Sequence, residues 1–300
     1  MSAAPLLEVE GLTRDFVLQR GLFGQPVRTL RAVDDVSFSI APGETLGLVG
    51  ESGSGKSTTG RMVLRLEEAS AGRIRFDGRD ITQLRGSALV PVRKQLQVVF
   101  QDPFSSLNPR LRVGESVGEP LRSHGLVRGQ AEQRERVAAL FAQVGLDPRF
   151  MDRFPHQFSG GQRQRIGIAR AIALGPKLIV ADEPITALDV SIQAQIVNLF
   201  LDLQEQLGMA YLFIAHDLGM VRYLCHRVAV MLRGRIVEMG PVAQVFADPR
   251  HPYTRALLSA APIPDPAREA QRRRIRYEPV PPPPGARLEE VAAGHWVLAA

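Results

Sequence analysis

Cysteine is nearly absent from this 300-residue chain, in which Cys225 is the only one. An intrachain disulfide and a metal cluster built from cysteine thiolates are therefore excluded, and a reducing compartment fits. The sequence also lacks a run of about 18 apolar residues, the length that a membrane-spanning helix needs. Met209–Ala215 is among the longest apolar runs and has only the length of a strand. We see no signal peptide at the N-terminus and expect a chain that does not cross a membrane by itself.

Lysine is scarce as well, because only Lys56, Lys94 and Lys177 occur and arginine supplies nearly all of the positive charge. The net charge is +6 and the sequence pI is about 10.1. Such a balance suits nucleic acid or anionic lipid headgroups. It fits a soluble protein with an arginine-biased composition equally well. The length suits one large or two smaller domains, and 45% hydrophobic residues are ample for a packed core.

A glycine-rich segment fits the phosphate-binding pattern G-x-x-x-x-G-K-[ST], the P-loop. It follows a short apolar stretch, Glu44–Val49, that predicts a buried strand, and Arg61–Leu66 continues as a helix. Backbone N–H groups, the lysine charge and the helix N-terminus would bind phosphates, and a serine hydroxyl would bind Mg²⁺. The residues predicted to bind ATP are Gly50, Glu51, Ser52, Gly53, Ser54, Gly55, Lys56, Ser57 and Thr58. The alternative, an ordinary glycine- and serine-rich turn, is much less favoured in this strand–loop–helix context.

The remaining pattern predicts an α/β fold: a P-loop nucleotide-binding core with a parallel sheet, an N-terminal antiparallel β layer and a helical insert. Half-buried strands are expected near the N-terminus, buried strands in the core, and helices in between. The expected strands are Leu6–Leu12, Val36–Ile40, Arg73–Asp77, Gln97–Phe100, Lys177–Ala181 and Tyr211–Ala215, and the expected helices include Arg163–Leu174 and Ser191–Leu207. Arg227–Leu232 and Arg235–Met239 are expected to form a hairpin around Arg233-Gly234.

We assign residues 1–261 to the nucleotide-binding domain, with the helical insert at about 102–175. Residues 262–300 are rich in proline and charge, and we interpret them as a peripheral, partly irregular tail. All proposed phosphate ligands lie between Gly50 and His216. Deletion of 262–300 is therefore expected to leave nucleotide affinity intact.

Two carboxylates, Asp182 and Glu183, directly follow the apolar stretch Leu178–Ala181. Four apolar residues and then two acids at a strand end form the Walker B pattern. Asp182 is predicted to hold Mg²⁺, and Glu183 to polarise the attacking water. Acidic pairs after strands are common in loops, and the P-loop upstream is what favours the functional interpretation.

A second anion site is predicted where Ser159, Gly160, Gly161 and Gln162 open a helix. One P-loop per chain leaves this site without its own nucleotide, so it is predicted to cover the γ-phosphate held by another subunit. If the segment stood alone, a simple serine–glycine helix cap would be the favoured interpretation. His216 ends a predicted core strand, where it is well placed to contact phosphate.

The order of these motifs resembles the ATP-binding cassette (ABC) ATPases over about residues 6–245. The resemblance implies that Phe16, an aromatic after the first strand, stacks on adenine and that Gln101 couples Mg²⁺ and water to the helical insert. It also implies that Asp189 lies at a dimer interface, that His216 contacts the γ-phosphate, and that Ser57, Gln101 and Asp182 hold the metal. Phe158 stands where the family usually has leucine, which leaves the Ser-Gly-Gly core intact.

A narrower resemblance rests on Phe100–Pro109, Leu188–Gln193 and His251–Thr254, which are similar to the oligopeptide/dipeptide importer ATPases. It implies a peripheral subunit at the cytoplasmic face of the inner membrane that couples ATP hydrolysis to peptide uptake. The implied partners are permease subunits, a second ATPase subunit (identical or paralogous) and an extracytoplasmic substrate-binding protein, with no nucleic acid. Nickel or glutathione import, a soluble non-transport ABC ATPase and a small-molecule P-loop kinase are the alternatives.

Overall fold

The computed structural model describes residues 4–21, 25–102, 107–186, 188–216, 218–260, 273–278, 280, 283 and 285–299. The chain divides into two compact units. Unit 1 comprises Met1–Gln83 and Leu212–Ala300, and unit 2 comprises Leu84–Tyr211. Among the described residues, no helix is long and apolar enough to cross a membrane.

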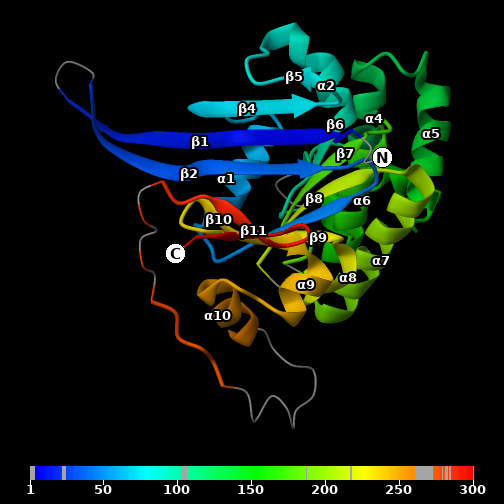
Figure 1. Cartoon of the computed structure of the whole chain (residues 1–300). Helices are drawn as coiled ribbons and strands as arrows, with labels where there is room; N and C mark the ends of the chain where they lie inside the picture. Colours follow the sequence, from blue (N-terminus) through cyan, green and yellow to red (C-terminus); the bar gives the residue numbers. More distant parts are fainter. Residues whose placement is uncertain are drawn as a thin grey trace. The chain divides into compact units, whose positions relative to one another are not determined.

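Unit 1 holds two sheets and several short helices (Figure 1). Its elements are β1 (Leu7–Arg20), β2 (Pro26–Ile40), β3 (Thr45–Val49), α1 (Lys56–Val63), β4 (Ala71–Phe76), β5 (Arg79–Asp80), α8 (Leu218–Leu224), β9 (Arg227–Leu232), β10 (Arg235–Pro241), α9 (Val242–Ala247), α10 (Pro252–Ala260), β11 (Leu288–Ala292) and β12 (His295–Leu298). The strand β8 (Ala210–Ala215) begins in unit 2 and ends in unit 1.

The first sheet of unit 1 is antiparallel, with the strand order β2-β1-β4-β5. Leu7 and Val9 of β1 are fully buried or nearly so, as the period-two pattern predicts. The pairing with β2 shifts register between Val9 and Leu12, and Leu12 is buried as well. Figure 1 shows β2, β1 and β4 side by side. The predicted antiparallel N-terminal layer is therefore confirmed, although β1 and β2 run longer than the sequence pattern indicates.

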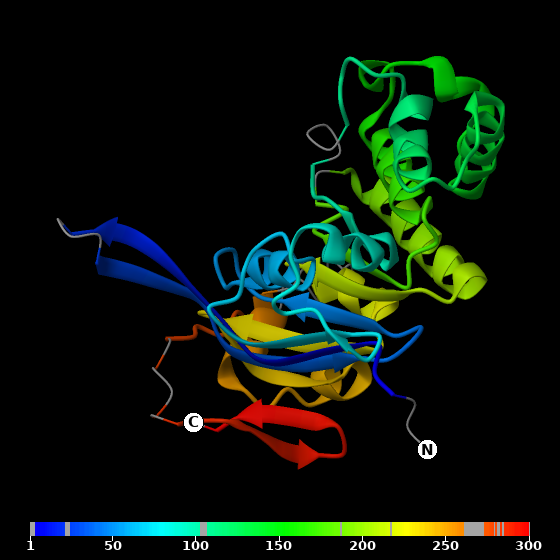
Figure 2. The ribbon, with the colours of Figure 1, turned by 90° about the horizontal axis from the view of Figure 1, so that it is seen from above.

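The second sheet of unit 1 has the order β11-β12-β10-β9-β3, followed by β8. The pair β3 and β9 is parallel, and all five residues of β3 are buried. The predicted hairpin between β9 and β10 is confirmed, because Arg233 (φ 47°) and Gly234 (φ 87°) both adopt the positive φ that a tight hairpin turn requires. Within the predicted tail, β11 and β12 form a hairpin at the sheet edge, drawn in red in Figure 2.

Unit 2 contains a parallel strand pair and a group of helices, several of which are drawn in green in Figure 2. Its elements are η1 (Gly86–Leu89), α2 (Val90–Gln95), β6 (Leu96–Val99), α4 (Val113–Ser123), α5 (Gln130–Gln143), η2 (Pro148–Asp152), η3 (Pro155–Gln157), α6 (Gly160–Ile172), β7 (Leu178–Asp182) and α7 (Val190–Leu207). The strands β6 and β7 are parallel. Val137 and Phe141 of α5 are buried, as the helical spacing predicts. An α/β fold with parallel strands is thus confirmed.

Candidate functional site

The P-loop connects the buried strand β3 to the helix α1. Gly50 (φ 151°) and Gly55 (φ 103°) have positive φ values that favour glycine. A Cβ atom would collide with the Met231 carbonyl oxygen at Gly50 and with the Ala32 carbonyl oxygen at Gly55. These glycines are therefore required both by backbone conformation and by the close approach of neighbouring strands.

The hairpin turn between β9 and β10 is hydrogen-bonded to the P-loop. The Gly234 N–H donates to the Ser54 carbonyl at 2.9 Å, and the Asp34 N–H donates to the Gly234 carbonyl at 2.9 Å. Ser54 is 5% exposed. A turn about 180 residues downstream in the chain thereby fixes the middle of the P-loop.

Lys56 lies inside the loop and is only 4% exposed. Its Nζ donates to the Gly50 and Glu51 carbonyls, both at 2.8 Å, and to Ser54 Oγ at 3.4 Å. The loop thus holds the ammonium group through its own oxygen atoms. An incoming phosphate would take over part of this coordination, as expected for a lysine that acts as a point charge.

Tyr253 also contacts the P-loop, and the sequence did not predict this contact. Its hydroxyl oxygen accepts a hydrogen bond from the backbone N–H of Glu51 at 3.0 Å. The ring is 2% exposed, and this burial raises the pKa of the phenol, so the hydroxyl stays protonated. The sequence signal at this position is the segment His251–Thr254, which by itself indicates only a family resemblance.

Two other predicted residues, Phe16 and His216, lie in unit 1, one within a strand and one directly after a strand. Phe16 is half-buried within β1, not after it, and the Arg14 guanidinium lies over its ring, 4.6 Å from the centroid. His216 is exposed and directly follows β8, the neighbour of β3 in the sheet. The P-loop and His216 therefore follow neighbouring strands of unit 1.

In unit 2, Asp182 is the last residue of β7, and Glu183 comes immediately after it. Both are half-buried. Glu183 has a φ of 47°, a conformation that non-glycine residues rarely adopt, and Thr186 Oγ1 donates to Glu183 Oε2 at 3.3 Å. Strained backbone of this kind clusters at functional sites, where the surrounding structure holds a side chain in one direction.

Gln101 lies two residues after β6 and is exposed. Residues 103–106 of the predicted segment Phe100–Pro109 are outside the described residues. The parallel strands β6 and β7 are paired through Val99 and Ala181. Gln101, two residues after β6, and Asp182, the last residue of β7, consequently lie at the same end of this strand pair.

The segment Ser159–Gln162 forms the start of α6, as predicted. Ser159 Oγ accepts from the Gln162 N–H at 3.3 Å, while Gln162 Oε1 accepts from the Ser159 N–H at 3.1 Å, which is a capping box. A Cβ at Gly161 would lie 2.5 Å from Ile192 Cγ2, so this glycine allows α6 to approach α7 closely. The capping box shows that this segment starts a helix, and Ser159 at its N-cap position is exposed.

Asp189 occupies the N-cap position of α7 and is exposed, and its side chain makes no capping hydrogen bond. Gln193, one turn into α7, donates to the Ile185 and Leu188 carbonyls at 3.2 and 2.9 Å. Gln193 therefore links Ile185 and Leu188 to the first turn of α7. It belongs to the stretch Leu188–Gln193 that the sequence identified only by resemblance.

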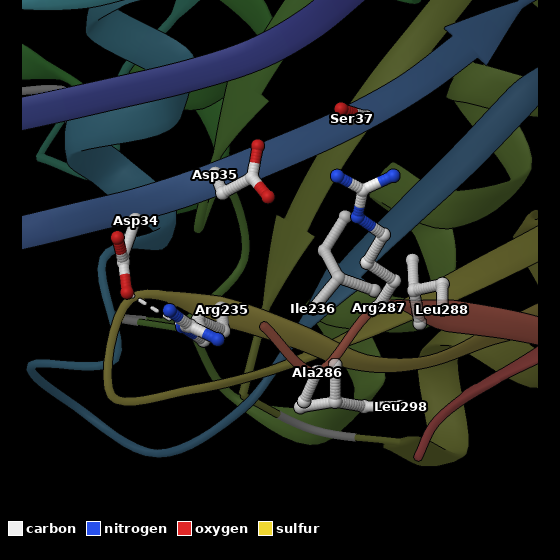
Figure 3. Close-up of a pocket in the computed structure, with 9 residues that line it drawn as sticks. All are labelled: Asp34, Asp35, Ser37, Arg235, Ile236, Ala286, Arg287, Leu288 and Leu298. Carbon is white, nitrogen blue, oxygen red and sulfur yellow. Dashed lines mark hydrogen bonds and ion pairs between the residues drawn. The ribbon is translucent and has the colours of Figure 1, made fainter. Parts of the chain in front are cut away.

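A separate hollow of about 190 Å³ lies in unit 1, beside β2, β10 and the C-terminal hairpin (Figure 3). Asp34 and Arg235 form an ion pair of 2.5 Å at its wall. None of the P-loop residues lines this hollow. We therefore do not assign it to the nucleotide site.

Two family models match this chain. The model described as "ABC transporter" matches residues 33–186, and the model described as "Oligopeptide/dipeptide transporter, C-terminal region" matches residues 237–286. The chain belongs to the ABC transporter family.

Its relatives include the glutathione import ATP-binding protein GsiA from several bacteria. GsiA of Salmonella typhimurium is 52% identical over 301 residues, which cover 98% of this chain and 48% of the relative. GsiA of Pectobacterium atrosepticum is 53% identical over 281 residues, 94% of this chain and 45% of the relative. The chain spans about half the length of these curated relatives.

Solved structures with the same fold include the ATP-binding cassette MJ0796, described as a dimeric post-hydrolysis state bound to ADP and Pi. It has a TM-score of 0.69 and 29% identity, covering 79% of this chain and 98% of that one. A second is cbiO1 from Clostridium perfringens, part of the ABC transporter complex cbiONQ, with a TM-score of 0.69 and 29% identity, covering 81% of this chain and 91% of that one.

Proposed function

We propose that this chain is the ATP-hydrolysing subunit of a bacterial ABC importer, bound peripherally at the cytoplasmic face of the inner membrane. The observation that carries this proposal is the P-loop itself. Its strand–loop–helix geometry, its two sterically required glycines and the buried Lys56 form a phosphate site in a chain of the ABC transporter family. ATP is the proposed nucleotide.

The residues of unit 1 bind the nucleotide in this proposal. The N–H groups of residues 53–58 and the Lys56 ammonium bind the phosphates, helped by the N-terminus of α1. Phe16 stacks on adenine and shares its ring with the Arg14 guanidinium, which favours an aromatic base on the other ring face. His216, exposed after β8, contacts the γ-phosphate.

Mg²⁺ is the proposed metal, because Ser57, Gln101 and Asp182 offer the hard oxygen ligands that it prefers. When bound, it neutralises charge on the phosphates. Glu183 accepts the proton of the attacking water at its carboxylate. The hydrogen bond from Thr186 and the strained backbone conformation of Glu183 support an assignment in which this carboxylate is held in a fixed direction.

We further propose that Ser159, Gly160, Gly161 and Gln162 cover the γ-phosphate held by a second ATPase subunit, with Asp189 at the interface between them. The exposed Ser159 and the half-buried Gly160 at the N-terminus of α6 support this role, since a helix N-terminus can offer N–H groups to an anion. The other proposed partners are integral-membrane permease subunits and an extracytoplasmic substrate-binding protein. Purification of the complex from membranes, followed by mass identification, tests this composition.

The proposed cargo is a short peptide, supported by the match of residues 237–286 to the oligopeptide/dipeptide transporter region. Glutathione, itself a small peptide, is the specific second candidate, because the GsiA relatives are named for its import. Uptake of labelled dipeptides, oligopeptides, glutathione and nickel in a disrupted strain separates these cargoes. Lost nickel uptake with unchanged uptake of all peptides would overturn the cargo proposal.

Glu183→Gln tests the catalytic proposal. An amide cannot accept the proton, so steady ATP hydrolysis should fall by about 10²–10⁴-fold while ATP affinity stays near that of the parent. Turnover within about twofold of the parent is too small a loss for a general base and would remove Glu183 from this role.

A further inference from the structure

The contact between Tyr253 and the P-loop joins two parts of unit 1 that are 202 positions apart in the chain. Tyr253 is the second residue of α10 and is almost completely buried. Its hydroxyl oxygen accepts from the Glu51 N–H. This N–H belongs to the peptide group whose carbonyl, that of Gly50, accepts from Lys56 Nζ at 2.8 Å.

One peptide group thus lies between the tyrosine and the lysine. Its N–H donates on one side, and its C=O accepts on the other. Hydrogen bonds in such a chain polarise one another, and the outer bond fixes the plane of the peptide. Rotation of the Gly50–Glu51 peptide would turn its carbonyl away from the Lys56 ammonium. Tyr253 opposes this rotation.

Tyr253 is also hydrogen-bonded, through its backbone N–H, to a buried polar network. The Tyr253 N–H donates to His251 Nδ1 at 3.1 Å, and the His251 N–H donates to Glu238 Oε2 at 3.0 Å. His295 Nε2 lies 2.7 Å from Glu238 Oε1. The side chains of Glu238, His295 and His251 are 0%, 3% and 9% exposed. Burial lowers the pKa of His251, and this effect exceeds the opposing effect of the Glu238 carboxylate. The imidazole is therefore neutral, and its Nδ1 can accept a hydrogen bond.

We propose that Tyr253 is a positioning residue for the P-loop, through which the C-terminal network of Glu238, His251 and His295 sets the affinity for nucleotide. The inference rests on the proposed ATP-binding function. In this proposal the segment His251–Thr254 orients the Gly50–Glu51 peptide of the P-loop. A tyrosine that contributed only to stability would not change the affinity of the folded protein for ATP.

Tyr253→Phe removes the acceptor and keeps the ring. We expect the Kd for ATP to rise about 3- to 10-fold, the change that corresponds to one hydrogen bond. Tyr211→Phe is the matched control, because the buried Tyr211 hydroxyl donates to the Phe200 carbonyl at 3.2 Å in unit 2. This control should lose stability and keep the parent Kd. Equal weakening of ATP binding in both variants would overturn the inference.

The lysines supply a readout that does not depend on ATP. The chain has only Lys56, Lys94 and Lys177, so acylation of each can be followed separately by mass spectrometry. Loss of the peptide orientation would weaken the hydrogen bonding that favours the charged form of Lys56, and its neutral amine would then react faster. Tyr253→Phe should accelerate acylation of Lys56 and leave Lys94 and Lys177 unchanged. An unchanged Lys56 rate together with an unchanged Kd would contradict the inference.

His251 provides a second, independent variant pair, which carries the test if Tyr253→Phe does not fold. Asparagine can place its amide oxygen near the position of Nδ1, whereas leucine cannot accept a hydrogen bond. His251→Leu should therefore raise the Kd and Lys56 acylation, and His251→Asn should restore values near the parent. Equal values for the two variants would count against the network. Absence of ATP binding by the unaltered chain would instead refute the proposed function.

Discussion

Replacing His295 by leucine tests whether the C-terminal hairpin is an integral part of unit 1. His295 is the first residue of β12, and its Nε2 lies 2.7 Å from the Glu238 carboxylate in β10. Leucine fills a similar volume but cannot donate a hydrogen bond. The variant should fold with a clearly lower free energy of unfolding, since a buried carboxylate loses a partner.

The magnitude follows from what remains around Glu238. Removing one partner of a fully buried charged pair costs about 3–5 kcal/mol, and one hydrogen bond to a charged group contributes about 1.5–3 kcal/mol. The Arg250 and His251 N–H groups still donate to the carboxylate, at 2.8 and 3.0 Å. We therefore expect a loss of about 2–3 kcal/mol, which lowers the melting temperature by about 4–12 °C.

The assay uses the single tryptophan of the chain. Trp296 follows His295 in β12 and is paired with Met239 of β10, so its fluorescence reports on the hairpin directly. Urea titration followed by Trp296 fluorescence should show an earlier transition in His295→Leu than in the parent. Circular dichroism on the same samples shows whether the rest of the chain unfolds together with the hairpin.

His295→Gln is the control, because its amide N–H can still donate to Glu238. It should recover at least about half of the lost free energy, as expected for a retained hydrogen bond. If the free energy of unfolding measured by Trp296 fluorescence for His295→Leu lies within about 0.5 kcal/mol of the parent value, the His295–Glu238 contact does not stabilise the hairpin. Surface substitutions without such partners have effects of that size.

Three further predictions follow from the sites described. Lys56→Ala should weaken ATP binding through the loss of phosphate charge, and unchanged affinity by equilibrium titration would contradict the P-loop assignment. Gly160→Arg should spare ATP binding by the isolated chain but prevent ATP-driven dimerisation and hydrolysis, so normal turnover at high protein concentration would disprove a two-subunit site. Cys225 is buried, and this burial raises the pKa of its thiol. It should therefore react with an alkylating reagent at pH 8 much more slowly in the folded than in the urea-unfolded protein, and equal rates would contradict its burial.

Local sequence patterns predicted the parts of the fold in which neighbouring residues dictate conformation. The strand β3, the P-loop and α1 follow from an apolar run, glycines and a helix start. The hairpin between β9 and β10 follows from Arg233-Gly234. In each case the physical signal lies within a few residues, which is why it can be recognised without knowledge of the rest of the chain.

The contacts between distant residues could not be predicted in this way. The strand β12 contains a buried histidine, so its pattern does not show the usual alternation of apolar and polar residues. Its partner, Glu238, is 57 positions away, and only the fold shows that the two meet. The positive φ of Glu183 likewise has no signature in its residue type. The alternation of apolar and polar residues ends at Leu12, so the pattern places Phe16 after the strand. In the structure β1 continues to Arg20 and includes Phe16.

The contacts of Glu238 connect the C-terminal region to the rest of unit 1. The region that matches the oligopeptide/dipeptide transporter model begins at residue 237, in the middle of β10, so it does not start at a domain boundary. Glu238 holds Arg250 and His251, and through His251 and Tyr253 the same region reaches the P-loop. Deletion of 262–300 would remove His295 and leave the buried Glu238 without its side-chain partner. On this structure we expect that deletion to weaken nucleotide binding, contrary to the expectation from the sequence, because the phosphate ligands depend on residues that lie outside the motif.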